Sequence, residues 1–120
     1  MPTRRRAESG AATAELALGI PLLVALTAGL VWMLAVGAAQ VRVIDASREA
    51  ARAVARGDDV IAAESVALRI APDDARVRIE AGETRIVVTT SARVSGPGGL
   101  LASLPGVTVS AEAVALVETS

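Results

Sequence analysis

The chain has 120 residues, a formal net charge of −1 and 52% hydrophobic residues, a length that allows one domain and an appendage. It holds no cysteine and no histidine, which excludes disulfides, thiolate nucleophiles, Cys/His metal sites and imidazole acid–base chemistry. Trp32 is its one aromatic residue, so no stacking platform for single-stranded nucleic acid exists and we expect no nucleic-acid partner.

The longest uncharged run is LALGIPLLVALTAGLVWMLAVGAA, from Leu16 to Ala39. As a helix it would be about 36 Å long, enough to cross a bilayer core of about 30 Å. We therefore predict a transmembrane helix over residues 11–39. Arg4–Arg6 precede the run without an acidic residue among them, so the positive-inside rule predicts a cytoplasmic N-terminus and an extracytoplasmic chain after residue 39.

Glu15 directly precedes this run, where a carboxylate costs on the order of 1–3 kcal/mol depending on its depth. One interpretation is a secretory signal peptide cut near residues 37–39, although its apolar core would exceed the usual length of roughly 7–15 residues. A second is an uncleaved single-span anchor in which Glu15 reaches the cytoplasmic headgroups. A third uses the whole opening stretch.

The segment RRRAESG followed by AATAEL resembles the prepilin leader of type IV pilin-like proteins. In those proteins a peptidase cuts after a glycine and leaves glutamate as the fifth residue of the mature chain. The resemblance implies that residues 1–10 are the leader, that Gly10 precedes the cut and that Ala11 becomes the new N-terminus. It also implies that the Glu15 carboxylate pairs with the α-amino group of a neighbouring subunit during assembly. Because Ala11 and Glu15 lie one helical turn apart, a contact within one chain is also possible.

The run with its early Pro21, followed by VRVIDASREAARAVA, extends the resemblance to the TadE-like family, minor pilins or pseudopilins of tight-adherence (Flp-type) pili. The implied partners are a prepilin peptidase, other pilin subunits, membrane lipid, and the inner-membrane assembly platform with its ATPase. The implied location is the cell membrane or the pilus at the cell surface. No catalytic residue, metal or cofactor is implied, and no residue pattern in the chain predicts one.

Three features inside the run have a physical meaning of their own. Pro21 removes a helical hydrogen bond and crowds the carbonyl of Ala17, which predicts a local kink. Ala25 and Gly29 form a small-xxx-small pair that could admit a second helix, although both residue types are common in this chain. Trp32 suits either an interfacial anchor or a lipid-facing position.

Residues 40–56 keep a helical period and are predicted to form an extracytoplasmic stalk, so that one helix covers residues 14–56. One stripe of the stalk is apolar or small: Val43, Ser47, Ala50 and Val54. Another is charged, and is either a solvated face or a surface for matching subunits: Arg42, Asp45, Glu49, Arg52 and Arg56. Gly57 is predicted to end the helix.

Residues 57–120 are predicted to form a small α+β head. Asp58 and Asp59 would cap a second helix over Val60–Ala71, and Asp73–Asp74 would lie in a turn. Neither acidic pair has the spacing of a calcium loop, so we predict no metal site. Three strands follow from the alternating pattern, over residues 76–80, 84–94 and 107–118. The loop over residues 95–106 contains three leucines that would plug the core: Leu100, Leu101 and Leu104.

The predicted fold is therefore α+β and pilin-like, with a long transmembrane and stalk helix, a short second helix and a small three-stranded antiparallel sheet. The predicted function is that of a non-enzymatic minor pilin or pseudopilin, processed after Gly10 and assembled through its apolar helix. Two alternatives remain open at this point. One is an uncleaved membrane-anchored protein with an extracytoplasmic binding module, and the other is a pseudopilin of a secretion or DNA-uptake system.

Overall fold

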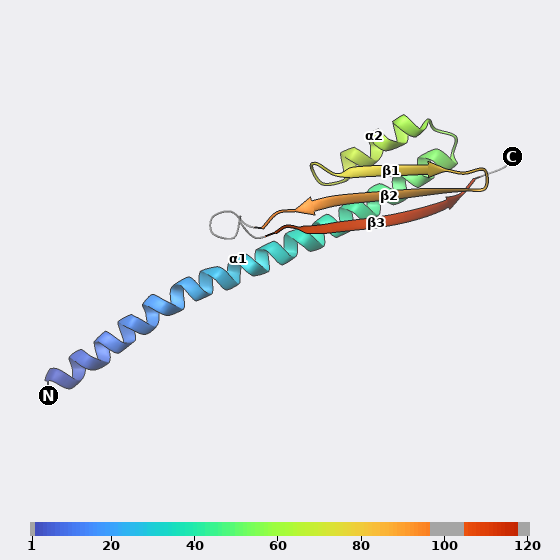
Figure 1. Ribbon diagram of the computed structural model, residues 1–120. Coiled ribbons are helices and arrows are strands. Elements are labelled where there is room, and N and C mark those ends of the chain that lie inside the picture. Colours follow the sequence, from blue (N-terminus) through green and yellow to red (C-terminus); the bar gives the residue numbers. More distant parts are fainter. Residues whose placement is uncertain (1, 97–104, 118–120) are drawn as a thin grey trace. The chain divides into compact units, whose positions relative to one another are not determined.

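A computed structural model describes residues 2–96 and 105–117, and its internal contacts divide the chain into two units, Met1–Met33 and Leu34–Ser120. The elements in chain order are α1 (Pro2–Ala55), α2 (Val60–Ile70), β1 (Arg76–Ala81), β2 (Arg85–Val94) and β3 (Val107–Leu116), labelled in Figure 1. The predicted α+β class, with a long first helix and a three-stranded antiparallel sheet, is confirmed.

Helix α1 begins earlier than the sequence pattern predicted. It starts at Pro2 and not near residue 14, so the segment interpreted as a leader is helical before any processing. Proline suits the first turn of a helix because its missing N–H has no partner there and its φ is already helical. The arginine, alanine and glutamate residues that follow are good helix formers, and Gly10 is too isolated to stop the helix.

Helix α1 ends at Ala55, and Gly57 terminates it as predicted. Gly57 has a φ of 100°, in the left-handed region that glycine adopts without a Cβ clash. The amide of Gly57 donates to the carbonyl of Val54 and the amide of Asp58 donates to the carbonyl of Ala53, each at 3.0 Å. These two bonds form a Schellman motif, which satisfies carbonyls that the helix would otherwise leave unpaired.

Helix α2 has the predicted position but a different cap. Asp59 is its N-cap residue, yet the Asp59 side chain accepts no capping hydrogen bond. The helix also ends one residue before the predicted Ala71, which is extended with φ −66° and ψ 160°. The cause is Pro72, because a proline disfavours helical backbone in the residue before it.

The sheet has the order β1-β2-β3 with both pairs antiparallel. Alternation along β2 divides the residues between two faces as predicted: Ile86, Val88, Thr90 and Ala92 are all buried. On β3 the predicted inner face holds buried Val109, while Val107 is exposed at the strand's start. The predicted leucine plug lies outside the described residues.

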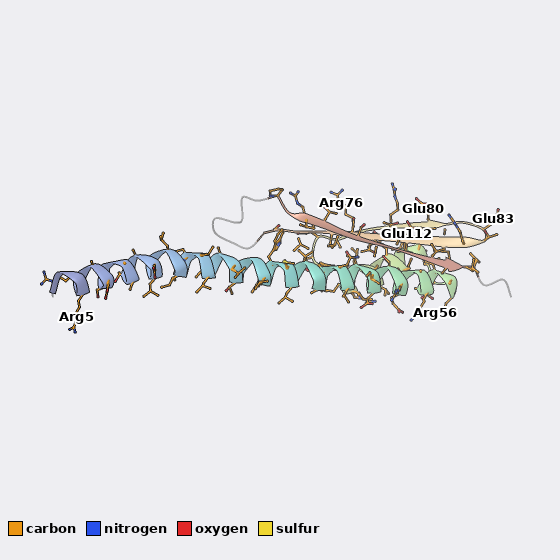
Figure 2. The ribbon with its side chains drawn as sticks, turned by 90° about the horizontal axis from the view of Figure 1, so that it is seen from below. Arg5, Arg56, Arg76, Glu80, Glu83 and Glu112 are labelled. Carbon is orange, nitrogen blue, oxygen red and sulfur yellow. The ribbon has the colours of Figure 1, made fainter. Side chains whose placement is uncertain are left out.

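The inner face of the sheet covers the stalk part of α1 and the helix α2, all within the unit that begins at Leu34. Alanine predominates in this core, which lets backbones approach closely. The buried residues of the main cluster are Ala46, Ala50, Ala51, Ala53, Ala63, Ala67, Ala71, Ile86 and Val88. A smaller cluster joins Ala39 and Val43 to Ala92 and Val109. Figure 2 shows Arg76, Glu80 and Glu112 on the opposite, outer face.

Candidate functional site

The residues singled out for processing lie together on α1. Gly10, Ala11 and Glu15 are all exposed, and all have helical backbone. A Cβ placed on Gly10 would meet nothing within 4 Å, so packing within the described chain gives no reason for a glycine at this position.

A side-chain hydrogen bond spans the peptide bond between Gly10 and Ala11. The Thr13 hydroxyl donates to the carbonyl of Ser9 at 2.9 Å, four residues back along the helix. The local backbone is therefore held by this contact in addition to the helical hydrogen bonds. A peptidase that reads an extended segment must first open these bonds, and glycine reduces the cost of that opening because it favours the unwound chain.

Glu15 lies one helical turn after Ala11, so the two residues share a face of α1. Among the described residues, ion pairs within 4.0 Å involve Glu49 and Asp58 with nearby arginines, and none involves Glu15. The Glu15 side chain is exposed on α1.

The apolar run beyond Glu15 is uncovered. The described helix contains an 18-residue window with a mean hydropathy of 2.2, of which 6% is buried within the chain. Leu18 and Leu22 are 78% and 70% exposed, and the leucines, valines and isoleucine around them are similarly open. Exposed apolar surface of this extent marks a membrane or protein interaction surface. The helix is long and apolar enough to cross a membrane.

Three other residue features were noted in the run: a proline, a pair of small residues and a tryptophan. Pro21 lies inside α1, which continues through it as one assigned helix, and the predicted kink stays a prediction. A shallow groove along the helix is lined in part by Ala25, Gly29 and Trp32, which is where the small-xxx-small pair was expected. Within the described residues, the Trp32 Nε1 is buried and has no hydrogen-bond acceptor.

The acidic pairs of the head occupy a cap and a turn. Asp59 begins α2, while the Asp58 carboxylate lies 3.7 Å from the Arg56 guanidinium. Asp74 has a φ of 60° in the turn between α2 and β1. Within residues 2–96 and 105–117, no group of three or more acidic side chains is close enough together to hold a metal ion.

The sequence interpretation did not predict one structural contact of the charged stripe. Arg42 donates from Nε to the carbonyl of Ile70 at 3.2 Å and from Nη2 to the carbonyl of Ala71 at 3.5 Å. A cation at this position satisfies carbonyls at the C-terminal end of α2 and complements the helix dipole. The rest of the stripe behaves as a solvated face, with Glu49 at 3.9 Å from both Arg52 and Arg56.

Comparison with known proteins identifies one segment. Residues 10–52 match the family model described as TadE-like protein, which confirms the resemblance to this family from Gly10 through the run and most of the stalk. The matched segment begins at the glycine of the candidate processing site. Because this family consists of structural pilus components, the match and the uncovered apolar helix point to a pilus-related, membrane-anchored protein. No curated protein and no solved structure matches the chain.

Proposed function

We propose that the chain is a minor pilin or pseudopilin of a tight-adherence (Flp-type) pilus. It is made with residues 1–10 as a leader, cut between Gly10 and Ala11, and assembled through its apolar helix. The observation that carries the proposal is a TadE-like segment that starts at Gly10 and contains an apolar helix that is almost entirely exposed among the described residues. Such a helix needs lipid before assembly and other helices after it.

The basic residues before the run give the orientation. With Arg4–Arg6 in the cytoplasm, the candidate cut lies on the cytoplasmic side and the head lies on the extracytoplasmic side. A prepilin peptidase, an assembly platform with its ATPase and fellow pilins are the partners in this scheme.

Glu15 supplies the assembly chemistry. Cutting before Ala11 creates a positively charged α-amino group one turn away from the carboxylate. In an apolar filament core the carboxylate of one subunit and the amine of its neighbour offset each other's desolvation cost, whereas either group alone would be strongly destabilising. The exposed Glu15 side chain is compatible with such an intermolecular pair.

The head favours a minor or initiating subunit over the bulk one. By resemblance, the main subunits of Flp pili consist of little more than the apolar helix. Here the unit Leu34–Ser120 has its own sheet and core. A subunit of this size at every position of a thin filament would be bulky, so placement at few positions suits it better.

The test is the intact mass of the membrane-extracted protein, with a co-expressed prepilin peptidase present or absent. We expect a chain that begins at Ala11 only when the peptidase is present. A chain that begins at Gln40 would instead identify a cleaved signal peptide. A chain that keeps Arg4–Arg6 in its native host would leave an uncleaved membrane anchor and overturn the proposal. Filament preparations then separate a pilus subunit from a pseudopilin of a secretion or DNA-uptake system.

A further inference from the structure

The outer face of the sheet carries a pocket lined by arginine. It has a volume of about 290 Å³, and its lining residues are Asp74, Arg76, Ser91, Ala92, Arg93 and Thr108. Arg76 is directly opposite Ser91 on the neighbouring strand, and Arg93 is opposite Thr108. Arg76 and Arg93 are therefore diagonal neighbours on adjacent strands, close enough for their long side chains to act on one ligand. We call this the arginine pocket.

The arginine pocket lies level with the end of the apolar run. The row that contains Arg76 continues through Ser91 to Ser110 on β3. The carbonyl of Ser110 accepts a hydrogen bond of 3.2 Å from the Gln40 side chain, and Gln40 is the first polar residue after the run. Ala39, the last residue of the run, is buried against Ala92 and its neighbours. All of these contacts lie within the unit that begins at Leu34.

If the apolar run spans the bilayer, Gln40 lies at its headgroup boundary, and the row of the sheet that contacts Gln40 is the row that contains Arg76. Arginine side chains at that height can extend to phosphates while their stems lie along apolar surface. The sequence of the segment 97–104 that connects β2 to β3 contains no charged residue, so it adds no competing acid.

The charges of the pocket favour an anion. Among the described residues, neither Arg76 nor Arg93 forms an ion pair within 4.0 Å, and both side chains are exposed. The hydroxyls of Ser91 and Thr108 add neutral donors. Asp74 contributes one carboxylate, which leaves the lining with a net positive charge. The acidic side chains Glu80 and Glu83 lie toward the β1–β2 hairpin, away from Arg76 (Figure 2).

We propose that the arginine pocket binds the headgroup of an anionic phospholipid in the extracytoplasmic leaflet. Guanidinium groups pair with phosphate oxygens through charge-assisted, often bidentate hydrogen bonds. Arg76 and Arg93 hold the phosphodiester, and the Asp74 carboxylate accepts from a hydroxyl of the headgroup, as in phosphatidylglycerol. This goes beyond the proposed pilin function: it rests on the membrane insertion and orientation proposed there, but not on the chain being cut or assembled.

A headgroup is the occupant that the position favours. An acidic side chain of a neighbouring subunit offers a similar anion, but no contact among the described residues favours one at this row, whereas the Gln40 contact places the row beside the end of the apolar run. Phospholipid headgroups are present at high local density at the end of the run whenever the run is inserted, and their phosphates attract nearby guanidinium groups. Free phosphate shares the chemistry and is distinguished by the test below.

The test uses the full chain in a non-ionic detergent, titrated with dioctanoyl phosphatidylglycerol and followed by native mass spectrometry. The test variant is Arg76→Gln with Arg93→Gln. The matched control is Arg85→Gln, an exposed arginine on the same outer face of β2 but at the other end of the sheet, opposite Leu116. We expect the double variant to lose about tenfold or more in lipid affinity, and the control to stay within about twofold of the original chain.

Three results would overturn the proposal. The first is equal lipid affinity for the double variant and the control. The second is equal binding of dioctanoyl phosphatidylcholine and phosphatidylglycerol by the original chain. The third is displacement of the lipid by inorganic phosphate but not by chloride at the same ionic strength, which would assign the pocket to free phosphate. Circular dichroism checks that the sheet persists, and the single variant Arg93→Gln replaces the double one if it does not.

Discussion

Ser47 on α1 and Thr90 on β2 are joined by a hydroxyl–hydroxyl hydrogen bond of 2.7 Å, and both residues have no exposed surface. The Ser47 hydroxyl is also 3.1 Å from the carbonyl of Ala111 on β3. Because a hydroxyl carries one proton, all three groups are satisfied when Thr90 donates to Ser47 and Ser47 donates to Ala111. This small network ties the stalk helix to two strands through a surface otherwise made of alanine and valine, and it fixes the register of the helix on the sheet.

The first prediction concerns this network. Ser47→Ala leaves the buried Thr90 hydroxyl without its side-chain partner and should lower the free energy of unfolding of the head by about 1–3 kcal/mol. Hydrogen exchange of β2 measures the loss. The double variant Ser47→Ala with Thr90→Val removes both hydroxyls at nearly constant shape and should cost less than the sum of the single changes. Additive costs would mean that the bond is not the reason for the loss.

The left-handed residue at the end of α1 gives the second prediction. Gly57→Ala puts a Cβ on a backbone with φ 100° and should destabilise the connection between the helices by roughly 1–2 kcal/mol. The control is Gly37→Ala in the same helix, where a Cβ meets nothing within 4 Å and the helix should gain stability. Hydrogen exchange over residues 50–60 distinguishes the two. Equal exchange in both variants would contradict the role of the Schellman motif.

Arg42 supports the third prediction. Arg42→Gln removes the cation from the carbonyls at the end of α2 and should destabilise that helix by about 1 kcal/mol. The expected loss is small because solvent partly screens the interaction between the guanidinium group and these carbonyls. Arg48→Gln is the matched control, since Arg48 is exposed on the same helix and has no hydrogen bond or ion pair among the described residues. The readout is hydrogen exchange of residues 60–71, and faster exchange in the control as well would indicate a general charge effect.

Processing gives the fourth prediction. Gly10→Ala should prevent most of the cut between Gly10 and Ala11, because alanine resists the unwound, close-fitting backbone that a peptidase needs. Gly19→Ala is a matched control, since a Cβ at either glycine meets nothing within 4 Å and both variants should keep their helix. Intact mass in the presence of the peptidase reports the cut. Normal processing of Gly10→Ala would remove the argument for this site.

The fifth prediction separates assembly from processing. Glu15→Gln keeps the size of the side chain but removes its charge, so the variant should be cut normally and fail to enter filaments. Glu8→Gln makes the same change in the leader, which is lost on processing, and should assemble as the original chain does. The fraction of the protein recovered in sheared filaments is the measurement. If filaments contain the Glu15→Gln variant at the same level as the original chain, the charge of the carboxylate is not required for assembly.

Much of the fold could be predicted because each element repeats a simple period. Strict alternation placed Ile86, Val88 and Thr90 on one face, and the helical spacing placed Val43 and Ser47 on the buried stripe. The TadE-like match confirmed the resemblance over the leader glycine, the run and the stalk. Each of these features depends on residues that are close in sequence, so one short segment is enough to predict it.

Contacts between distant residues could not be predicted in this way. Arg42 looked like one more charge on a solvated stripe, because its acceptors belong to a helix end 28 residues later in the chain. Ser47 and Thr90 were placed on the correct faces but not paired, since their contact depends on the register of α1 against the sheet. The start of α1 was predicted too late because residues 1–10 were assigned to a leader and not to the helix, whereas the residues of that segment have a helix propensity of their own.

The helical leader means that a cut after Gly10 would create a helix terminus where the uncut chain has helix interior. The Thr13 hydroxyl would lose the Ser9 carbonyl that it now contacts, and the first amides after the cut would lose their acceptors as well. Proteolysis would therefore produce, in one step, a cluster of unsatisfied donors and a new positive charge at the edge of the bilayer. A filament that binds these donors and this charge would therefore take up cut subunits and exclude uncut ones.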